Sequence, residues 1–296
     1  MAEKIKLEGS MVALVTPFRN GEVDYDALAR LIDYQLEGGT QGLIPCGTTG
    51  ESPTLSHDEH DKVIEFTVER AAGKVPVIAG TGSNSTAEAL RLTRHAKDAG
   101  ADAALIVNPY YNKPTQQGMY EHIAAIAEVG LPIVLYNIPS RTGIELTPET
   151  IIRMYNEIDQ VIAIKEATGK IDNASALAAG CDITIISGDD ALTLPICSVG
   201  GKGVISVLAN ILPSEIRALC DAILAGDLQS ATEMHLRLFP LFKAMFVETN
   251  PIPIKAALSM IGMIEDELRL PLVPLSQKHR PKLAEMLKSF GLKVNQ

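Results

Sequence analysis

A lysine at the end of an apolar run is the first candidate for chemistry in this sequence. Lys165 directly follows residues 161–164, a β-branched run without polar alternation that is typical of a strand buried on both faces. A lysine near an apolar core reaches water, pairs with a carboxylate, or loses its proton and becomes an amine nucleophile. Glu166 is adjacent, so a paired or solvent-directed lysine is the alternative to a nucleophile.

Polar side chains also follow other apolar runs. Thr48 and Thr49 lie in a glycine-bounded segment, which predicts either a tight turn or a nest of amides for a carboxylate. Tyr136 ends the run VLY, and Arg141 lies in the loop PSRTG, where a guanidinium is either solvated or bound to a carboxylate. An imine-forming amine needs an acid–base group, a carboxylate anchor and a dry wall, so these neighbours favour a nucleophilic Lys165.

The elements that must position these residues alternate regularly. Eight strand-like runs are each followed by a helical pattern, and they cover residues 11–18, 42–47, 75–80, 103–108, 132–137, 161–165, 184–188 and 203–206. Strand–helix units repeated in this way predict a (β/α)8 barrel of the α/β class, with chemistry at the carboxyl ends of the strands. We expect the closed barrel top and Ile164 to lower the pKa of Lys165.

Helix-start signals support this order of elements. Asp24 precedes the first helical pattern, and we expect it to cap that helix. Ser56 with Glu59, and Ser85 with Glu88, have the spacing of capping boxes. The chain from 227 to 296 contains helical patterns only, which predicts a catalytic barrel over residues 1–226 and a C-terminal helical domain over residues 227–296.

Charge and composition exclude several classes of function. The net charge of −10, without a cluster of Lys or Arg, argues against a nucleic-acid partner. No apolar run is long enough to span a bilayer and the start lacks a signal-peptide core, so we expect no membrane association and a cytoplasmic location. The cysteines are far apart, which favours reduced thiols: Cys46, Cys181, Cys197 and Cys220.

Two weaker signals are set aside. His57 and His60 are three residues apart, but without an HExxH pattern we expect no metal site there. Residues 80–85 have two of the three glycines of a dinucleotide fingerprint and no acidic ribose partner after the next strand, so we expect no dinucleotide cofactor.

These motifs resemble those of the pyruvate-dependent class I aldolases related to N-acetylneuraminate lyase. The resemblance covers essentially the whole chain, through VALVTPF, GTTGES, NPYYNKP, YNIPSRTG, IAIKEATG, SGDD, GGKGVISV and NPIPIKAAL. Within the family it points to the branch that condenses pyruvate with L-aspartate 4-semialdehyde in the diaminopimelate route to lysine. It also implies a barrel with a C-terminal helical domain, a homotetramer built as a dimer of dimers, and no metal or organic cofactor.

The resemblance assigns roles to individual residues. It implies that Lys165 forms a Schiff base with pyruvate and that Tyr136 transfers protons. Thr48 and Tyr111 would complete a proton relay, with Tyr111 reaching in from a neighbouring subunit. The turn of Thr48 and Thr49 would hold the pyruvate carboxylate, and Arg141 the carboxylate of the second substrate. Two further residues would line the site through their backbones, namely Gly188 and Ile205.

A regulatory site is also implied. In feedback-inhibited members, an L-lysine site lies at a subunit interface beside the catalytic cleft. The residues that match it here are Ser52, Pro53, His57, His60, Asn84, Glu88 and Tyr110. Pro53 departs from the small residue that is commoner there. The alternative is that Glu88 only completes a capping box and that the histidines decorate a helix start.

Three other functions compete with this interpretation. A sister aldolase, such as a sialic acid lyase or a keto-deoxy-sugar aldolase, would typically lack an arginine matching Arg141. A pyridoxal phosphate barrel also uses a lysine at a strand end, and an aldimine absorbance would identify it. A binding barrel without turnover would usually have lost Lys165 or Tyr136, and this sequence has both.

Overall fold

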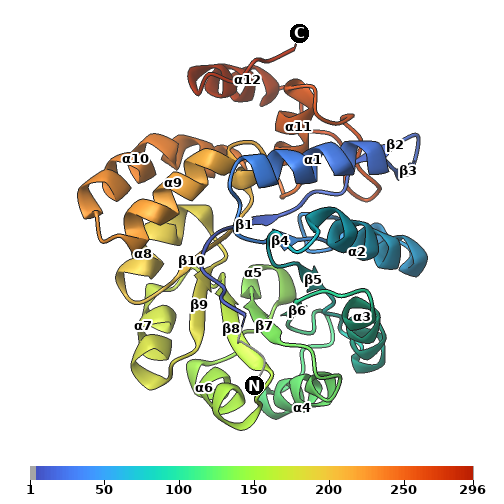
Figure 1. The fold of residues 1–296 in the computed structure, drawn as a ribbon, viewed down its shortest axis with the longest axis vertical. Helices are drawn as coiled ribbons and strands as arrows, with labels where there is room; N and C mark the ends of the chain where they lie inside the picture. Colours follow the sequence, from blue (N-terminus) through green and yellow to red (C-terminus); the bar gives the residue numbers. More distant parts are fainter. Residues whose placement is uncertain (1–4, 296) are drawn as a thin grey trace.

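Eight parallel strands form the centre of the computed structural model, which describes residues 5–295 (Figure 1). They are β1 (Gly9–Ala13), β4 (Leu43–Ile44), β5 (Ile78–Gly80), β6 (Ala103–Val107), β7 (Ile133–Asn137), β8 (Val161–Glu166), β9 (Thr184–Ser187) and β10 (Gly203–Ser206). Their order is β4-β1-β10-β9-β8-β7-β6-β5, and a parallel bridge between Leu43 and Val77 joins its two ends. The predicted barrel is confirmed.

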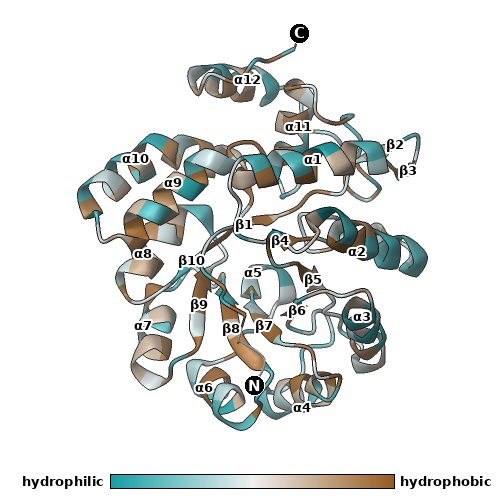
Figure 2. Ribbon diagram, viewed as in Figure 1, coloured by the Kyte–Doolittle hydropathy of each residue, from teal (hydrophilic) through white to brown (hydrophobic). Residues whose placement is uncertain are grey.

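Helices surround the strands on the outside (Figure 1). They are α1 (Tyr25–Glu37), α2 (His57–Ala71), α3 (Thr86–Asp98), α4 (Gln116–Ala127), α6 (Pro148–Glu157), α7 (Ile171–Gly180), α8 (Thr193–Ser198) and α9 (Pro213–Leu224). Shorter turns follow four of the strands, namely η1 (Ser52–Thr54), α5 (Pro139–Thr142), η2 (Asp190–Leu192) and η3 (Leu208–Asn210). Hydrophobic residues concentrate on the strands, whereas the helices carry hydrophilic residues as well (Figure 2).

Side chains of the strands alternate between two apolar layers. The inner layer fills the barrel and includes Met11, Ala163 and Ile205. The outer layer packs against the helices and includes Val12 and Ile164. This parity follows from the two-residue repeat of a strand, and it decides which residues can reach a site inside the barrel.

The first strand is shorter than its apolar run suggested. β1 ends at Ala13, and Phe18 instead begins a small hairpin of β2 (Phe18–Arg19) and β3 (Glu22–Val23). Asn20 and Gly21 turn this hairpin with φ of 56° and 85°. An Asn-Gly pair favours such a two-residue turn, so the predicted strand over residues 11–18 is wrong beyond residue 13.

Helix starts agree with the sequence at two of three positions. The Asp24 side chain accepts a hydrogen bond from the backbone of α1, and Ser56 and Glu59 form the expected capping box of α2. The second box is wrong, because the Ser85 side chain caps nothing and Glu88 does not bond back to it. Glu88 is bound instead to the Ser83 hydroxyl and to the His57 ring.

Three helices follow the barrel along the chain: α10 (Leu228–Ala244), α11 (Ile252–Met260) and α12 (Arg280–Ser289). Through residue 295 no strand occurs after β10. α10 packs directly against α8 and α9, while α11 and α12 pack together at the top of the view in Figure 1. The division into domains at residues 226 and 227 stays a prediction.

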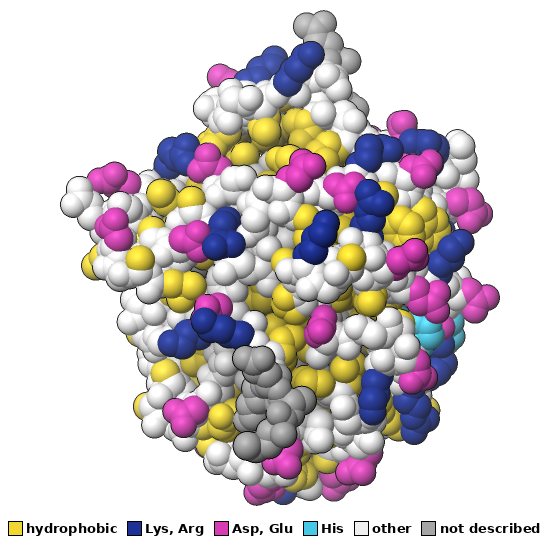
Figure 3. Space-filling model, viewed as in Figure 1, with side chains coloured by type: hydrophobic (Ala, Val, Ile, Leu, Met, Phe, Trp, Pro, Cys, Tyr) yellow, Lys and Arg dark blue, Asp and Glu magenta, His cyan; other side chains and the backbone are white. Residues whose placement is uncertain are grey.

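The surface carries charges of both signs. On the face shown in Figure 3, Lys and Arg side chains are interspersed with Asp and Glu. Within the described part of the chain, no helix has the length and apolar character needed to cross a bilayer.

Candidate active site

Lys165 and Tyr136 lie side by side at the carboxyl ends of two neighbouring strands. β7 and β8 pair in parallel with Tyr136 opposite Lys165. The lysine Nζ lies 4.3 Å from the centroid of the tyrosine ring, and both residues are buried. Strand register therefore brings together the predicted nucleophile and the predicted acid–base residue.

Burial changes the proton affinity of the lysine. Loss of solvation lowers the pKa of Lys165 from 10.5 to about 7, with a smaller effect of Arg141 in the same direction and an opposing one from Asp190. The Ile164 side chain belongs to the outer apolar layer, and its share in this effect stays a prediction. Residues of the inner layer, such as Ala163, share the lysine's face of β8. Near neutral pH, much of the amine is unprotonated and nucleophilic.

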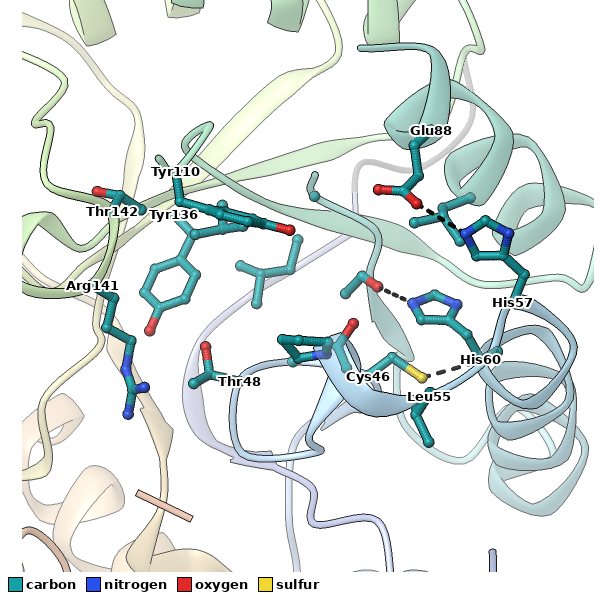
Figure 4. Close-up of a pocket in the computed structure, with 18 residues that line it drawn as sticks. Cys46, Thr48, Leu55, His57, His60, Glu88, Tyr110, Tyr136, Arg141 and Thr142 are labelled. Carbon is teal, nitrogen blue, oxygen red and sulfur yellow. Dashed lines mark hydrogen bonds and ion pairs between the residues drawn. The ribbon is translucent and has the colours of Figure 1, made fainter. Parts of the chain in front are cut away.

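Tyr136 is a proton donor at neutral pH. Burial raises its pKa to about 12, while the charge of Arg141 and hydrogen bonding with Thr48 act in the opposite direction. Thr48 and Tyr136 line the same cavity, where the Tyr136 hydroxyl lies on the side of Thr48 and Arg141 (Figure 4). A tyrosine hydroxyl linked to a second hydroxyl can pass a proton to and from a reacting group.

The loop after β4 forms the predicted glycine-bounded turn. The Gly50 N–H donates to the Gly47 carbonyl at 3.1 Å, and the Thr16 hydroxyl donates to the Gly50 carbonyl at 2.7 Å. Thr48 is half-buried at the cavity wall, and Thr49 is buried. Hydroxyls and backbone amides on one turn match the chemistry of a carboxylate.

Gly188 lies against the Lys165 side chain, and the predicted role of Gly188 and Ile205 in lining the site through their backbones stays a prediction. A Cβ atom added at Gly188 would lie 3.0 Å from Cγ and 3.1 Å from Cε of Lys165. The lysine side chain therefore packs against the backbone of a residue without a side chain. Ile205 is buried in the inner apolar layer of the barrel. Glycine at position 188 leaves the space that the reactive side chain fills.

Arg141 is held by a residue that the sequence analysis did not identify. Nη2 of Arg141 donates to the Asn250 carbonyl at 2.8 Å, and Nδ2 of Asn250 donates to the Thr49 hydroxyl at 3.0 Å. Asn250 lies just before α11, about 110 residues beyond Arg141. Its one signal was the motif NPIPIKAAL, to which no role had been assigned.

One cavity of about 370 Å³ connects the two predicted sites (Figure 4). Its wall includes Thr48, Tyr136 and Arg141 together with six of the seven residues predicted for L-lysine, namely Ser52, Pro53, His57, His60, Glu88 and Tyr110. Asn84 is not part of this wall, but its side chain donates to the Tyr110 carbonyl at 3.1 Å. Residues predicted for the two sites thus line one cavity.

The two histidines of this cavity differ in environment. His57 is exposed and lies 2.9 Å from a carboxylate oxygen of Glu88. His60 is buried, contacts the Gly80 carbonyl through Nε2, and has its pKa lowered by burial to about 4. Among residues 5–295, no three His, Cys, Asp or Glu side chains form a metal-binding group, and all four cysteines are free.

Tyr111 is not part of the cavity of its own chain. It follows β6, has a φ of 72° and is 90% exposed. Its predicted entry into the site of a neighbouring subunit stays a prediction.

Comparisons with known proteins give one answer. The Dihydrodipicolinate synthetase family matches residues 6–290. A 4-hydroxy-tetrahydrodipicolinate synthase of Syntrophus aciditrophicus is 52% identical over 288 residues, which are 96% of this chain and 99% of the relative. The crystal structure of dihydrodipicolinate synthase from Aquifex aeolicus is 50% identical, with a TM-score of 0.97 over 98% of this chain and 100% of that one.

A third relative was solved with a ligand. The structure of this enzyme from Cyanidioschyzon merolae with lysine bound is 40% identical, with a TM-score of 0.94 over 96% of this chain and 98% of that one. The family match spans nearly all of the described chain. The chain therefore belongs to the dihydrodipicolinate synthetase family.

Proposed function

We propose that this protein is a lyase of the class I aldolase type that condenses pyruvate with L-aspartate 4-semialdehyde to form 4-hydroxy-tetrahydrodipicolinate. The observation that carries the proposal is a buried amine with a pKa of about 7 that lies 4.3 Å from the ring of Tyr136, a residue that lines one cavity together with Thr48 and Arg141. The high identity to synthases of this name supports the substrate pair. As a step of lysine and diaminopimelate biosynthesis, the reaction belongs in the cytoplasm.

The reaction begins with attack of the neutral Lys165 amine on the pyruvate ketone. Tyr136 delivers a proton to the departing hydroxyl, water leaves and an imine remains. Loss of a methyl proton gives the enamine, whose carbon attacks the aldehyde of the second substrate. The amino group of that substrate then closes the ring and releases the lysine. The imine itself is the electron sink, so the chemistry needs no further cofactor.

Two anionic groups need recognition during this sequence. The turn of Thr48 and Thr49 offers hydroxyls and amides to the pyruvate carboxylate, and the guanidinium of Arg141 offers a planar fork to the carboxylate of the second substrate. The bond from Arg141 to the Asn250 carbonyl keeps that guanidinium beside Thr49. This arrangement favours an amino-acid aldehyde over the polyol chain of a sugar-cleaving relative.

The active assembly is proposed to be a homotetramer built as a dimer of dimers. Tyr111 supports this proposal, because an aromatic side chain that is 90% exposed at the rim of a catalytic barrel is suited to contact a second copy. In the pair, Tyr111 of one subunit would complete the relay of Tyr136 and Thr48 in the other.

L-Lysine is proposed as the feedback inhibitor. Glu88 offers a carboxylate to an ammonium group, while Asn84 and Tyr110 offer polar contacts to the remaining ends of the amino acid. The lysine-bound relative from Cyanidioschyzon merolae supports this choice of ligand. The shared cavity supports a coupling between inhibitor and substrate, since Tyr110 precedes the relay residue Tyr111.

Borohydride trapping tests the proposed chemistry directly. Reduction in the presence of pyruvate should add one pyruvate-derived group per chain, and peptide mass analysis should place it on Lys165. Lys165→Ala should form no adduct, whereas the control Lys170→Ala, which removes an exposed lysine after the same strand, should form it normally. An adduct of normal yield in Lys165→Ala would refute the assignment.

A further inference from the structure

A fully buried ion pair joins the end of the Thr48 and Thr49 turn to the C-terminal helices. Nζ of Lys255 donates a 2.5 Å hydrogen bond to Oε1 of Glu51, and both side chains are 0% exposed. Moving two charges out of water is costly, and such a pair is seldom a net source of stability. The contacts of the two residues indicate a different use.

Glu51 is the residue that closes the turn. Its φ of 53° is left-handed, a conformation that residues other than glycine rarely adopt. Its N–H donates to the Thr48 carbonyl at 3.1 Å, which ties it to the residue beside Tyr136. The second carboxylate oxygen accepts the backbone N–H of Arg269 at 3.1 Å. Both oxygens of Glu51 are thus fixed by the C-terminal part of the chain.

Lys255 reaches the turn by a second route. Its Nζ also donates to the Thr16 carbonyl at 2.9 Å, and the Thr16 hydroxyl donates to the Gly50 carbonyl. On the same segment of the chain, Asn250 donates to the Thr49 hydroxyl. Residues 250–255 therefore bond Thr49 and Glu51 directly and reach Gly50 through Thr16, although the turn itself lies about 200 residues earlier.

From these contacts we propose that Glu51 and Lys255 are positioning residues for substrate binding. The pair touches no reacting atom. It fixes the backbone of the turn so that Thr48 and Thr49 receive the carboxylate of an α-keto acid, and this role rests on the function proposed above for the turn. A buried salt bridge with several fixed hydrogen-bond partners specifies one conformation of the turn. An apolar pair of similar size would not specify it, and this accounts for two charged residues in the core.

A charge-neutral double variant separates positioning from stability. Glu51→Gln with Lys255→Met leaves no unpaired buried charge, so the double variant should fold and should melt at a higher temperature than either single variant. In borohydride trapping, the pyruvate concentration that gives the half-maximal trapping rate should then be raised. The trapping rate at low pyruvate concentration should fall roughly tenfold to a hundredfold. The rate at saturating pyruvate should change little, because Lys165 and Tyr136 are untouched.

Two further variants complete the test. Asp266→Asn with Arg280→Met removes a second ion pair of the C-terminal part, and as a matched control it should leave pyruvate dependence unchanged. Thr16→Val removes only the hydroxyl bond to Gly50 and should weaken pyruvate use in the same direction but less.

The outcomes distinguish the two proposals. A folded double variant with the pyruvate dependence of the wild type would overturn the positioning role. If that variant does not fold, wild-type behaviour of Thr16→Val would overturn it instead. A wild-type protein that forms no pyruvate adduct would refute the proposed function itself.

Discussion

Replacing Lys165 by methionine should stabilise the protein at neutral pH while abolishing imine formation. The pKa of Lys165 falls from 10.5 to about 7 because its ammonium is buried. Below pH 7 the folded state holds a charged amine in an unfavourable environment, and this lowers stability. Between pH 7 and 10.5 the unfolded chain binds more protons than the folded one, so this contribution makes stability rise with pH.

The size of the effect follows from the two pKa values. Each tenfold change in proton affinity corresponds to about 1.4 kcal/mol, so the full cost of burying the ammonium is about 5 kcal/mol at low pH. At pH 7 it is still about 4 kcal/mol, and at pH 9 it has fallen to about 2 kcal/mol. Stability of the wild type should therefore rise by about 2 kcal/mol more than that of Lys165→Met between these two values.

Urea unfolding at pH 7 and pH 9 measures this difference, at equal protein concentration because assembly also contributes to stability. Both pH values lie above the pKa of about 6 to which burial raises Asp190, so that carboxylate stays largely ionised. Other titrating groups are common to both proteins and cancel in the comparison. Equal pH dependence of the two proteins would show that Lys165 has an ordinary pKa, whatever the absolute stabilities are.

Three further predictions concern two residues of the cavity wall and the glycine that lies against Lys165. Arg141→Ala should raise the KM for L-aspartate 4-semialdehyde roughly tenfold to a hundredfold, because a charge-assisted hydrogen bond to a carboxylate contributes free energy of that size. Trapping of pyruvate by borohydride should stay largely intact. An equal loss of trapping would show that Arg141 binds pyruvate or has only a structural role. Steady-state rates should fall on addition of millimolar L-lysine in the wild type and not in Glu88→Ala, and inhibition of the variant at wild-type strength would remove the regulatory site. Gly188→Ala places a methyl group 3.0 Å from Cγ of Lys165 and should slow the trapping of pyruvate by borohydride. The control Gly118→Ala, in a helix, should not slow it. Adduct formation measured in borohydride reactions stopped at successive times would give both rates.

Patterns that are local in sequence predicted most of the fold and drew attention to Lys165 and Tyr136, which the structure places side by side. Parallel strands buried on both faces are apolar throughout, so a reactive residue such as Lys165 stands out at the end of its run. Because the carboxyl ends of parallel strands meet at one rim, Tyr136 and Thr48 could be expected beside it without knowledge of distances. The position of the buried lysine and of its neighbours could therefore be predicted from two features: the alternation of strands and helices, and polar or charged side chains that are unusual at the end of an apolar strand.

The errors have equally local causes. The Asn-Gly pair at residues 20 and 21 marks a hairpin turn, but the apolar run before it suggested a longer strand. Glu88 has capping-box spacing, yet the His57 ring and the Ser83 hydroxyl compete successfully for its carboxylate.

Contacts over long sequence separation are the part that local patterns could not supply. Asn250 and Lys255 lie in a segment that reads as an ordinary apolar helix start, and a lysine there would be expected at the surface. Their partners Thr49 and Glu51 are about 200 residues away, and no periodicity relates the two segments. The C-terminal helices thus supply residues that shape the substrate turn, so their removal should alter pyruvate binding even though every strand of the barrel precedes them.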